Sequence, residues 1–107
     1  MFATIRRYNF RDPTKAKDAF AGLKRRIEDN FVPMLHDVPG FHSYHVLNSN
    51  DRELVTISIF ETRAGTEEST RRAAEFVRQD PLKDEMMPPE IIEGDLLVSK
   101  EAAATAH

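Results

Sequence analysis

Apolar residues that recur at every second position predict four β-strands in this chain. The expected strands cover residues 2–8, 41–47, 53–61 and 91–100. The run from Asn48 to Asp51 is a strong turn signal between the second and third of them. These two strands are therefore expected to form a hairpin.

Apolar residues spaced by three and four positions predict a first helix after the first strand. Asp12 is a suitable capping residue, and Pro13 suits the first helical position. Pro33 is expected to kink or end this helix, so that Met34 and Leu35 would form an irregular turn. The buried stripe is expected to consist of Ala16, Phe20, Leu23, Ile27 and Phe31.

A second helix is expected to begin at Thr62 and to end before Asp80, with Ala73, Phe76 and Val77 as its apolar stripe. Residues 82–87 are expected to add one more helical turn. The order β-α-β-β-α-β predicts an α+β, ferredoxin-like fold, in which a four-stranded antiparallel sheet carries both helices on one face.

The length of 107 residues fits one domain, which is expected to cover residues 1–100. Residues 101–107 have no apolar anchor and are expected to form a disordered tail.

The composition narrows the classes of partner. The net charge of -3 comes with no basic stripe, so no nucleic-acid partner is expected. No stretch approaches the ~18 apolar residues that a membrane-spanning helix needs, and no lipidation motif is present, so no membrane partner is expected. The absence of cysteine excludes disulfides and thiolate metal sites and fits a cytoplasmic location, as does the lack of an apolar signal-peptide segment after Arg7.

Both faces of the predicted sheet carry large apolar side chains, although one layer of helices can cover only one face. In the first strand, Phe2 and Tyr8 are expected to lie opposite Ala3 and Ile5. In the second strand, Phe41 and Leu47 are expected to lie opposite Tyr44 and Val46. In the third, Val55, Ile57 and Ile59 are expected to lie opposite Leu54, Thr56, Ser58 and Phe60. An exposed apolar face of this kind favours a homodimer formed through the open sheet face, and the alternative is a monomer with a half-polar open face.

Three segments resemble the antibiotic biosynthesis monooxygenase superfamily: Val38–Tyr44 (VPGFHSY), Val55–Glu61 (VTISIFE) and Ala64–Ser69 (AGTEES). The resemblance covers about residues 2–100 and implies a dimeric α/β barrel. The superfamily includes cofactor-independent oxygenases, haem-degrading enzymes, isomerases and members of unknown role, so the resemblance implies a fold more strongly than an activity.

The haem-degrading branch fits this chain poorly. That branch carries a tryptophan where this sequence has Phe60, and no tryptophan occurs anywhere in the chain. It also carries a haem-ligating histidine in the segment that corresponds to residues 82–87, which contain none. No cofactor is therefore expected.

A cofactor-free oxygenase needs a general base with a pKa near the working pH and hydrogen-bond donors that stabilise an oxyanion. The candidate bases are His42 and His45, which would point to opposite faces of a regular strand and could not share a metal without a bulge. No metal site is expected. The candidate substrate-binding residues are Arg6, Tyr8, Tyr44, Thr56, Ser58 and Phe60. Simple packing or surface exposure is the alternative interpretation for each of them.

Together with the resemblance, these residues predict a cofactor-independent monooxygenase-like protein that acts on a small aromatic or quinol-type compound. The alternative is a non-catalytic dimeric module that binds a small molecule or has a structural or stress-related role. The sequence leaves open which face of the sheet lines a pocket.

Overall fold

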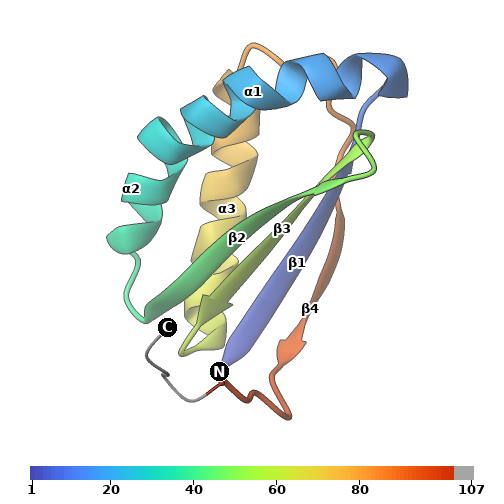
Figure 1. The fold of residues 1–107 in the computed structure, drawn as a ribbon. Helices are drawn as coiled ribbons and strands as arrows, with labels where there is room; N and C mark the ends of the chain where they lie inside the picture. Colours follow the sequence, from blue (N-terminus) through green and yellow to red (C-terminus); the bar gives the residue numbers. More distant parts are fainter. Residues whose placement is uncertain (103–107) are drawn as a thin grey trace.

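A computed structural model describes residues 1–102 of the chain (Figure 1). The predicted disordered tail therefore lies outside the described residues from position 103 onward. The elements in chain order are β1 (Phe2–Asn9), the 3₁₀ turn η1 (Pro13–Lys15), α1 (Ala16–Arg26), the π-helical segment η2 (Ile27–Phe31), α2 (Val32–His36), β2 (Phe41–Ser49), β3 (Glu53–Phe60), α3 (Arg63–Gln79) and β4 (Glu90–Asp95).

The four strands form one antiparallel sheet in the order β2-β3-β1-β4. Figure 1 shows α3 and the continuous α1–η2–α2 segment on the same side of this sheet. The α+β, ferredoxin-like fold predicted from the sequence is confirmed. Among residues 1–102, no helix is both long enough and apolar enough to cross a membrane.

The two faces of the central strand β3 have different surroundings, as its alternating sequence predicts. Leu54 and Phe60 are buried under the helices together with Thr56 and Ser58 between them. Val55, Ile57 and Ile59 point to the opposite face, which no helix covers, and are only partly buried. The helix-covered face thus contains the core, and the open face keeps an apolar surface.

A β-bulge in β2 changes the expected directions of its side chains. Phe41 pairs with Phe60, whereas Ser43 already pairs with Ile59, so His42 is an extra residue in the ladder. Phe41 consequently lies on the helix-covered face with Tyr44, and its ring centroid is 5.5 Å from that of Phe60. The expectation that Phe41 and Tyr44 lie on opposite faces was wrong because a regular strand was assumed.

The sequence predicts that Pro33 kinks or ends the first helix, and the helix does not end there. α1 passes into the π-helical turn η2, in which the Val32 N–H donates to the Ile27 carbonyl, and then into α2, which contains Pro33, Met34 and Leu35. The wider π turn is a place where a residue without an N–H can be accommodated without breaking the helix. Met34 and Leu35 are therefore helical, and the chain bends at η2 (Figure 1).

The second helix begins and ends where the sequence indicates. Thr62 caps α3, since its Oγ1 accepts a hydrogen bond from the Gly65 N–H at 3.3 Å, and the helix ends before Asp80.

The segment after α3 differs from the prediction. Residues 82–87 form turns and one bridge, Met86 to Phe10, instead of another helical turn. β4 ends at Asp95 instead of Lys100, because Asp95 already pairs with Phe2, the first residue of its neighbour β1.

Candidate functional site

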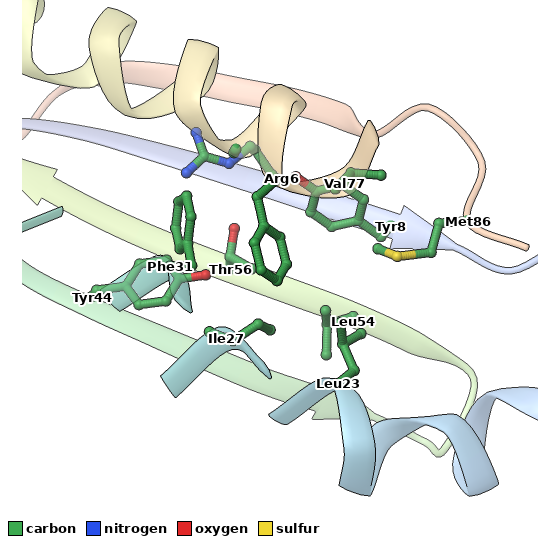
Figure 2. Close-up of a pocket in the computed structure, with 12 residues that line it drawn as sticks. Arg6, Tyr8, Leu23, Ile27, Phe31, Tyr44, Leu54, Thr56, Val77 and Met86 are labelled. Carbon is green, nitrogen blue, oxygen red and sulfur yellow. The ribbon is translucent and has the colours of Figure 1, made fainter. Parts of the chain in front are cut away.

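A small cavity of about 20 Å³ lies between the sheet and the helices (Figure 2). This volume holds about one water-sized group. All three parts of the core contribute to its walls: the strands, the α1–η2 segment and α3. The lining residues are Arg6, Tyr8, Leu23, Ile27, Phe31, Tyr44, Leu54, Thr56, Ala73, Phe76, Val77 and Met86.

Arg6 is the most unusual of these residues because its charged side chain is only 1% exposed. Its Nη1 donates to Oγ1 of Thr70 at 2.8 Å, and its Nη2 donates to Oγ of Ser58 at 3.0 Å. Its Nε has no hydrogen-bond partner. The guanidinium is thus held between β3 and α3 by two neutral hydroxyls, with donor capacity left unused.

In the described part of the chain, no carboxylate forms an ion pair with Arg6. Glu93 on β4 pairs with Thr4, two residues before Arg6 on β1, and therefore lies on the same face of the sheet as Arg6. Its carboxylate accepts a long hydrogen bond of 3.5 Å from Thr4. Buried charges in proteins are normally paired, because removing a charge from water is costly. A buried cation without a counter-ion indicates a site that can receive an anion.

The two tyrosines of the cavity remain neutral under ordinary conditions. Burial raises the pKa of Tyr8 and raises that of Tyr44 further, and the nearby positive charge of Arg6 opposes this effect only in part. Both phenols are therefore hydrogen-bond donors at neutral pH and not bases. Figure 2 shows the Tyr44 hydroxyl directed towards Thr56, whose buried Oγ1 makes no other hydrogen bond within residues 1–102.

The helical side of the cavity is apolar and aromatic. The π-helical turn η2 places Ile27 and Phe31 against the sheet, and such turns are common near functional sites. The Phe31 ring centroid lies 5.5 Å from that of Tyr44 and 5.5 Å from that of Phe76. This aromatic cluster forms the apolar side of the cavity, next to the hydroxyl of Tyr44.

A groove of about 520 Å³ adjoins the cavity between the α1–η2 segment and β2. The cavity and the groove share Ile27, Tyr44 and Leu54, which form the wall between them. The groove is mostly apolar, and its volume falls within the range of pockets that bind small organic molecules. Its remaining lining residues are Phe20, Ala21, Lys24, Glu28, Val32, Val46 and Asn48.

Four of the predicted substrate-binding residues line the cavity together: Arg6, Tyr8, Tyr44 and Thr56. Ser58 lies behind them as a hydrogen-bond partner of Arg6.

Phe60, His42 and His45 do not reach the cavity. Phe60 is fully buried at the end of β3 and packs against Phe41 and the backbone of Gly65. His42 and His45 are exposed on β2, and His45 pairs with Ile57 on the open face of the sheet. The bulge at His42 does not create a metal site, since residues 1–102 contain no group of three His, Asp or Glu side chains arranged for a metal.

Sequence reasoning missed Thr70, which holds Arg6 from α3. Thr70 lies four residues after Thr66 and three before Ala73, in line with the buried stripe of the helix. A hydroxyl at a position where the periodicity calls for an apolar residue was the available signal.

Neither a family model nor a curated protein matches this sequence. Solved structures do share its fold. A monooxygenase from Streptomyces coelicolor, ActVA-Orf6 in complex with the ligand nanaomycin D, superposes with a TM-score of 0.68 at 17% identity and covers 95% of this chain and 92% of its own. SnoaB, a cofactor-independent oxygenase from Streptomyces nogalater, gives a TM-score of 0.63 at 13% identity and covers 92% of this chain and 94% of its own.

A third structure is described as a dimeric ferredoxin-like protein from an uncultured marine organism. It gives a TM-score of 0.74 at 8% identity and covers 94% of this chain and 98% of its own. The fold is therefore the one adopted by antibiotic biosynthesis monooxygenases, as the sequence resemblance implies. At these identities the likeness establishes the fold alone.

Proposed function

We propose that this protein is a cofactor-independent monooxygenase-like enzyme that acts on a small aromatic or quinol-type compound. The observation that carries the proposal is a buried cluster of hydrogen-bond donors, centred on Arg6, directly behind the wall of an apolar groove. The likeness in fold to a ligand-bound monooxygenase and to a cofactor-independent oxygenase supports this choice.

The groove and the cavity suit different parts of such a compound. An aromatic ring fits the apolar groove between the α1–η2 segment and β2. The small cavity accepts one ring oxygen, which Arg6, Tyr8 and Tyr44 meet with hydrogen-bond donors. Entry requires a small displacement of the shared wall, of which Tyr44 is the largest member.

The reaction that fits this arrangement is oxygenation of a substrate anion by molecular oxygen. Loss of a proton from an activated phenol, enol or methylene group gives an electron-rich anion, and donors aimed at its oxygen stabilise the charge. For an activated methylene between two rings, one oxygen atom becomes the new carbonyl oxygen. The second oxygen atom leaves as water with both hydrogens of that carbon, so the carbon loses four electrons and O₂ gains four.

The base for that proton remains a prediction. His42 and His45 were the predicted bases, and both are exposed on β2 outside the cavity wall. Turnover by the His42→Ala and His45→Ala variants decides their role, since unchanged rates in both variants would remove them from the mechanism.

The proposal includes a homodimer formed through the open face of the sheet. Ile5, Val55, Ile57 and Ile59 line this face without a covering layer, and Ile92 beside them is 67% exposed. The charge of Arg7 on this face does not oppose a second copy, because Arg7 already forms ion pairs with Glu53 and Glu90. A structural neighbour is described as dimeric, which supports a dimer but not a particular interface.

Oxygen uptake by chelator-treated protein tests the activity against hydroquinones, anthrones and naphthols. We expect protein-dependent uptake above the autoxidation blank for at least one class. The Ala21→Phe variant narrows the groove at an exposed wall position and should lower uptake, whereas Ala74→Phe makes the same change on an exposed part of α3 outside the groove and should not.

The second candidate function is a non-catalytic module that binds a small molecule. The observation in its favour is that the cavity walls carry no carboxylate or imidazole that could act as a base. Ligand binding without oxygen uptake across the whole panel would support this module and contradict the oxygenase.

A further inference from the structure

We infer that the cavity selects ligands with an acidic hydroxyl and holds them as single-oxygen anions, with Arg6 as the counter-ion. This inference rests on the site of the proposed function and names its ligand class. It concerns a binding equilibrium and does not require oxygen.

The positive charge of the site is buried and bonded to neutral groups. Arg6 is 1% exposed, its Nε is unpartnered, and its two hydrogen bonds go to the neutral hydroxyls of Ser58 and Thr70. A guanidinium carries five N–H donors, and these two bonds leave that of Nε among the unused ones. An anion that enters the cavity gains a charge-assisted hydrogen bond and supplies the negative charge that no carboxylate provides.

The size of the cavity then restricts the anion. About 20 Å³ accommodates one water-sized group, such as the oxygen of a phenolate or enolate. A carboxylate brings two oxygens and a carbon to the same place and needs more room. The cavity therefore favours a phenolate over a carboxylate, although both carry the same charge.

The groups around Arg6 restrict the ligand further. Tyr8 and Tyr44 face it from β1 and β2 as neutral donors, β3 and α3 contribute the hydroxyls of Ser58 and Thr70, and η2 contributes apolar side chains. Glu93 on β4 faces Thr4 and belongs to a separate surface hollow with Arg63 and Glu67. Because no base lines the cavity, the ligand has to ionise by its own acidity, assisted by the charge of Arg6.

Binding of 4-nitrophenol in oxygen-free buffer tests the inference, since its phenolate absorbs visible light and its phenol does not. The chain has two tyrosines and no tryptophan, and both tyrosines line the cavity, so quenching of tyrosine fluorescence reports occupancy of this site. We expect the pKa of the bound nitrophenol to fall by about 1 to 3 units, as for an acid beside a buried arginine.

Variants assign the effect to Arg6. Arg6→Gln should abolish the fall, and Arg6→Lys, which keeps the charge, should preserve part of it. Arg25→Gln removes one positive charge from an exposed position on α1 and should leave the fall unchanged. Far-ultraviolet circular dichroism and a urea midpoint confirm that each variant is folded before it is compared.

Two matched ligands test the size and charge of the head group. Under the same conditions 4-nitrobenzoate, a carboxylate, and 4-nitroanisole, which cannot ionise, should bind at least tenfold more weakly than 4-nitrophenol. Equal binding of either analogue, an unchanged pKa of nitrophenol, no binding of nitrophenol, or a fall that survives in Arg6→Gln would each overturn the inference.

Oxygen uptake and anion binding together distinguish failure of the proposed function from failure of this inference. Anion binding that depends on Arg6, without oxygen uptake from any substrate, would leave this inference standing and contradict the oxygenase. Oxygen uptake that persists in Arg6→Gln would contradict this inference and leave the oxygenase standing.

Discussion

The ring of Phe60 lies directly against the backbone of Gly65, at the start of α3. A Cβ atom on residue 65 would be 2.7 Å from Cδ1 of Phe60 and 2.9 Å from its Cβ. Phe60 is fully buried and also packs against Phe41, so it has little room to move. Five residues further along the same helix, Thr70 accepts a hydrogen bond of 2.8 Å from Arg6 on the sheet.

Gly65→Ala is therefore expected to destabilise the protein, although alanine is the better helix former. Overpacking costs about 1–3 kcal/mol, and the gain in helix propensity returns less than about 1 kcal/mol. Gly94→Ala is the control, because a Cβ there meets no atom within 4 Å and the substitution then mainly restricts the unfolded chain. Urea unfolding should show a lower midpoint for the first variant and a higher one for the second. A higher midpoint for both would show that Phe60 yields easily.

Two arginines, the buried Arg6 and the partly buried Arg26, should respond differently to the same substitution. Arg26 donates from Nε and Nη2 to the two carboxylate oxygens of Asp80, at 2.8 and 3.0 Å, whereas Arg6 has no carboxylate partner. Arg26→Met leaves Asp80 buried without its partner and should cost about 3–5 kcal/mol. Arg6→Met removes an unpaired buried charge and should cost less than about 1 kcal/mol.

Chemical denaturation of the two methionine variants measures this difference directly. A loss for Arg6→Met as large as that for Arg26→Met would mean that Arg6 has a structural role in the core. A small loss, or a gain, is the expected behaviour of a residue whose burial serves binding.

The sequence was sufficient to predict the order of the elements and the two faces of β1 and β3. These follow from side-chain alternation within single strands, a local property. β2 was different, because the extra residue at His42 moves Phe41 to the face of Tyr44, and nothing in the local pattern distinguishes a bulge from a regular strand.

The candidate site was predictable only as a set of residue types. Arg6, Tyr8, Tyr44 and Thr56 were all candidates, but an arginine in a strand normally reaches solvent. Its burial depends on Ser58 and Thr70, which lie 52 and 64 positions away in the chain. Such contacts are set by the packing of α3 on the sheet, and the only local sign of them in the sequence is the hydroxyl of Thr70 in line with the buried stripe of the helix.

The tyrosines predict how the protein responds to alkali. Burial raises the pKa of Tyr8 and of Tyr44 above the usual value of 10.0. Above about pH 10 the unfolded chain therefore releases phenolic protons that the folded chain retains, and the free energy of unfolding falls as the pH rises. Below that pH these groups give no such dependence.

Ultraviolet absorbance checks this behaviour cleanly, because the chain has two tyrosines and no tryptophan. We expect no tyrosinate signal near pH 10 while the circular dichroism remains native, and about half ionisation of the two phenols at that pH in urea, where their pKa has its usual value of 10.0. Tyr44→Phe should make stability less dependent on pH above 10. A normal titration of both phenols in the folded protein would mean that the cavity is open to water.

The open sheet face predicts the effect of a charge at its centre. Ile57 lies on the middle strand β3, between Ile5 on β1 and His45 on β2, and its side chain points away from the helices. Ile57→Lys should convert the proposed homodimer to a folded monomer, because two buried lysines would face each other across the proposed interface without counter-ions. Sedimentation velocity over a range of concentrations measures the change, and circular dichroism confirms the fold.

Ile91→Lys is the matched control for the same substitution on the other face of the sheet. Ile91 is 45% exposed on β4 and pairs with Arg6, so it belongs to the helix-covered side. This variant should remain dimeric. A dimer that persists in Ile57→Lys but dissociates in Ile91→Lys would place the interface on the β4 edge instead of the open face, and monomeric wild-type protein would contradict the dimer itself. In either case Ile5, Ile57 and Ile59 would have to be explained as an exposed apolar surface with another partner.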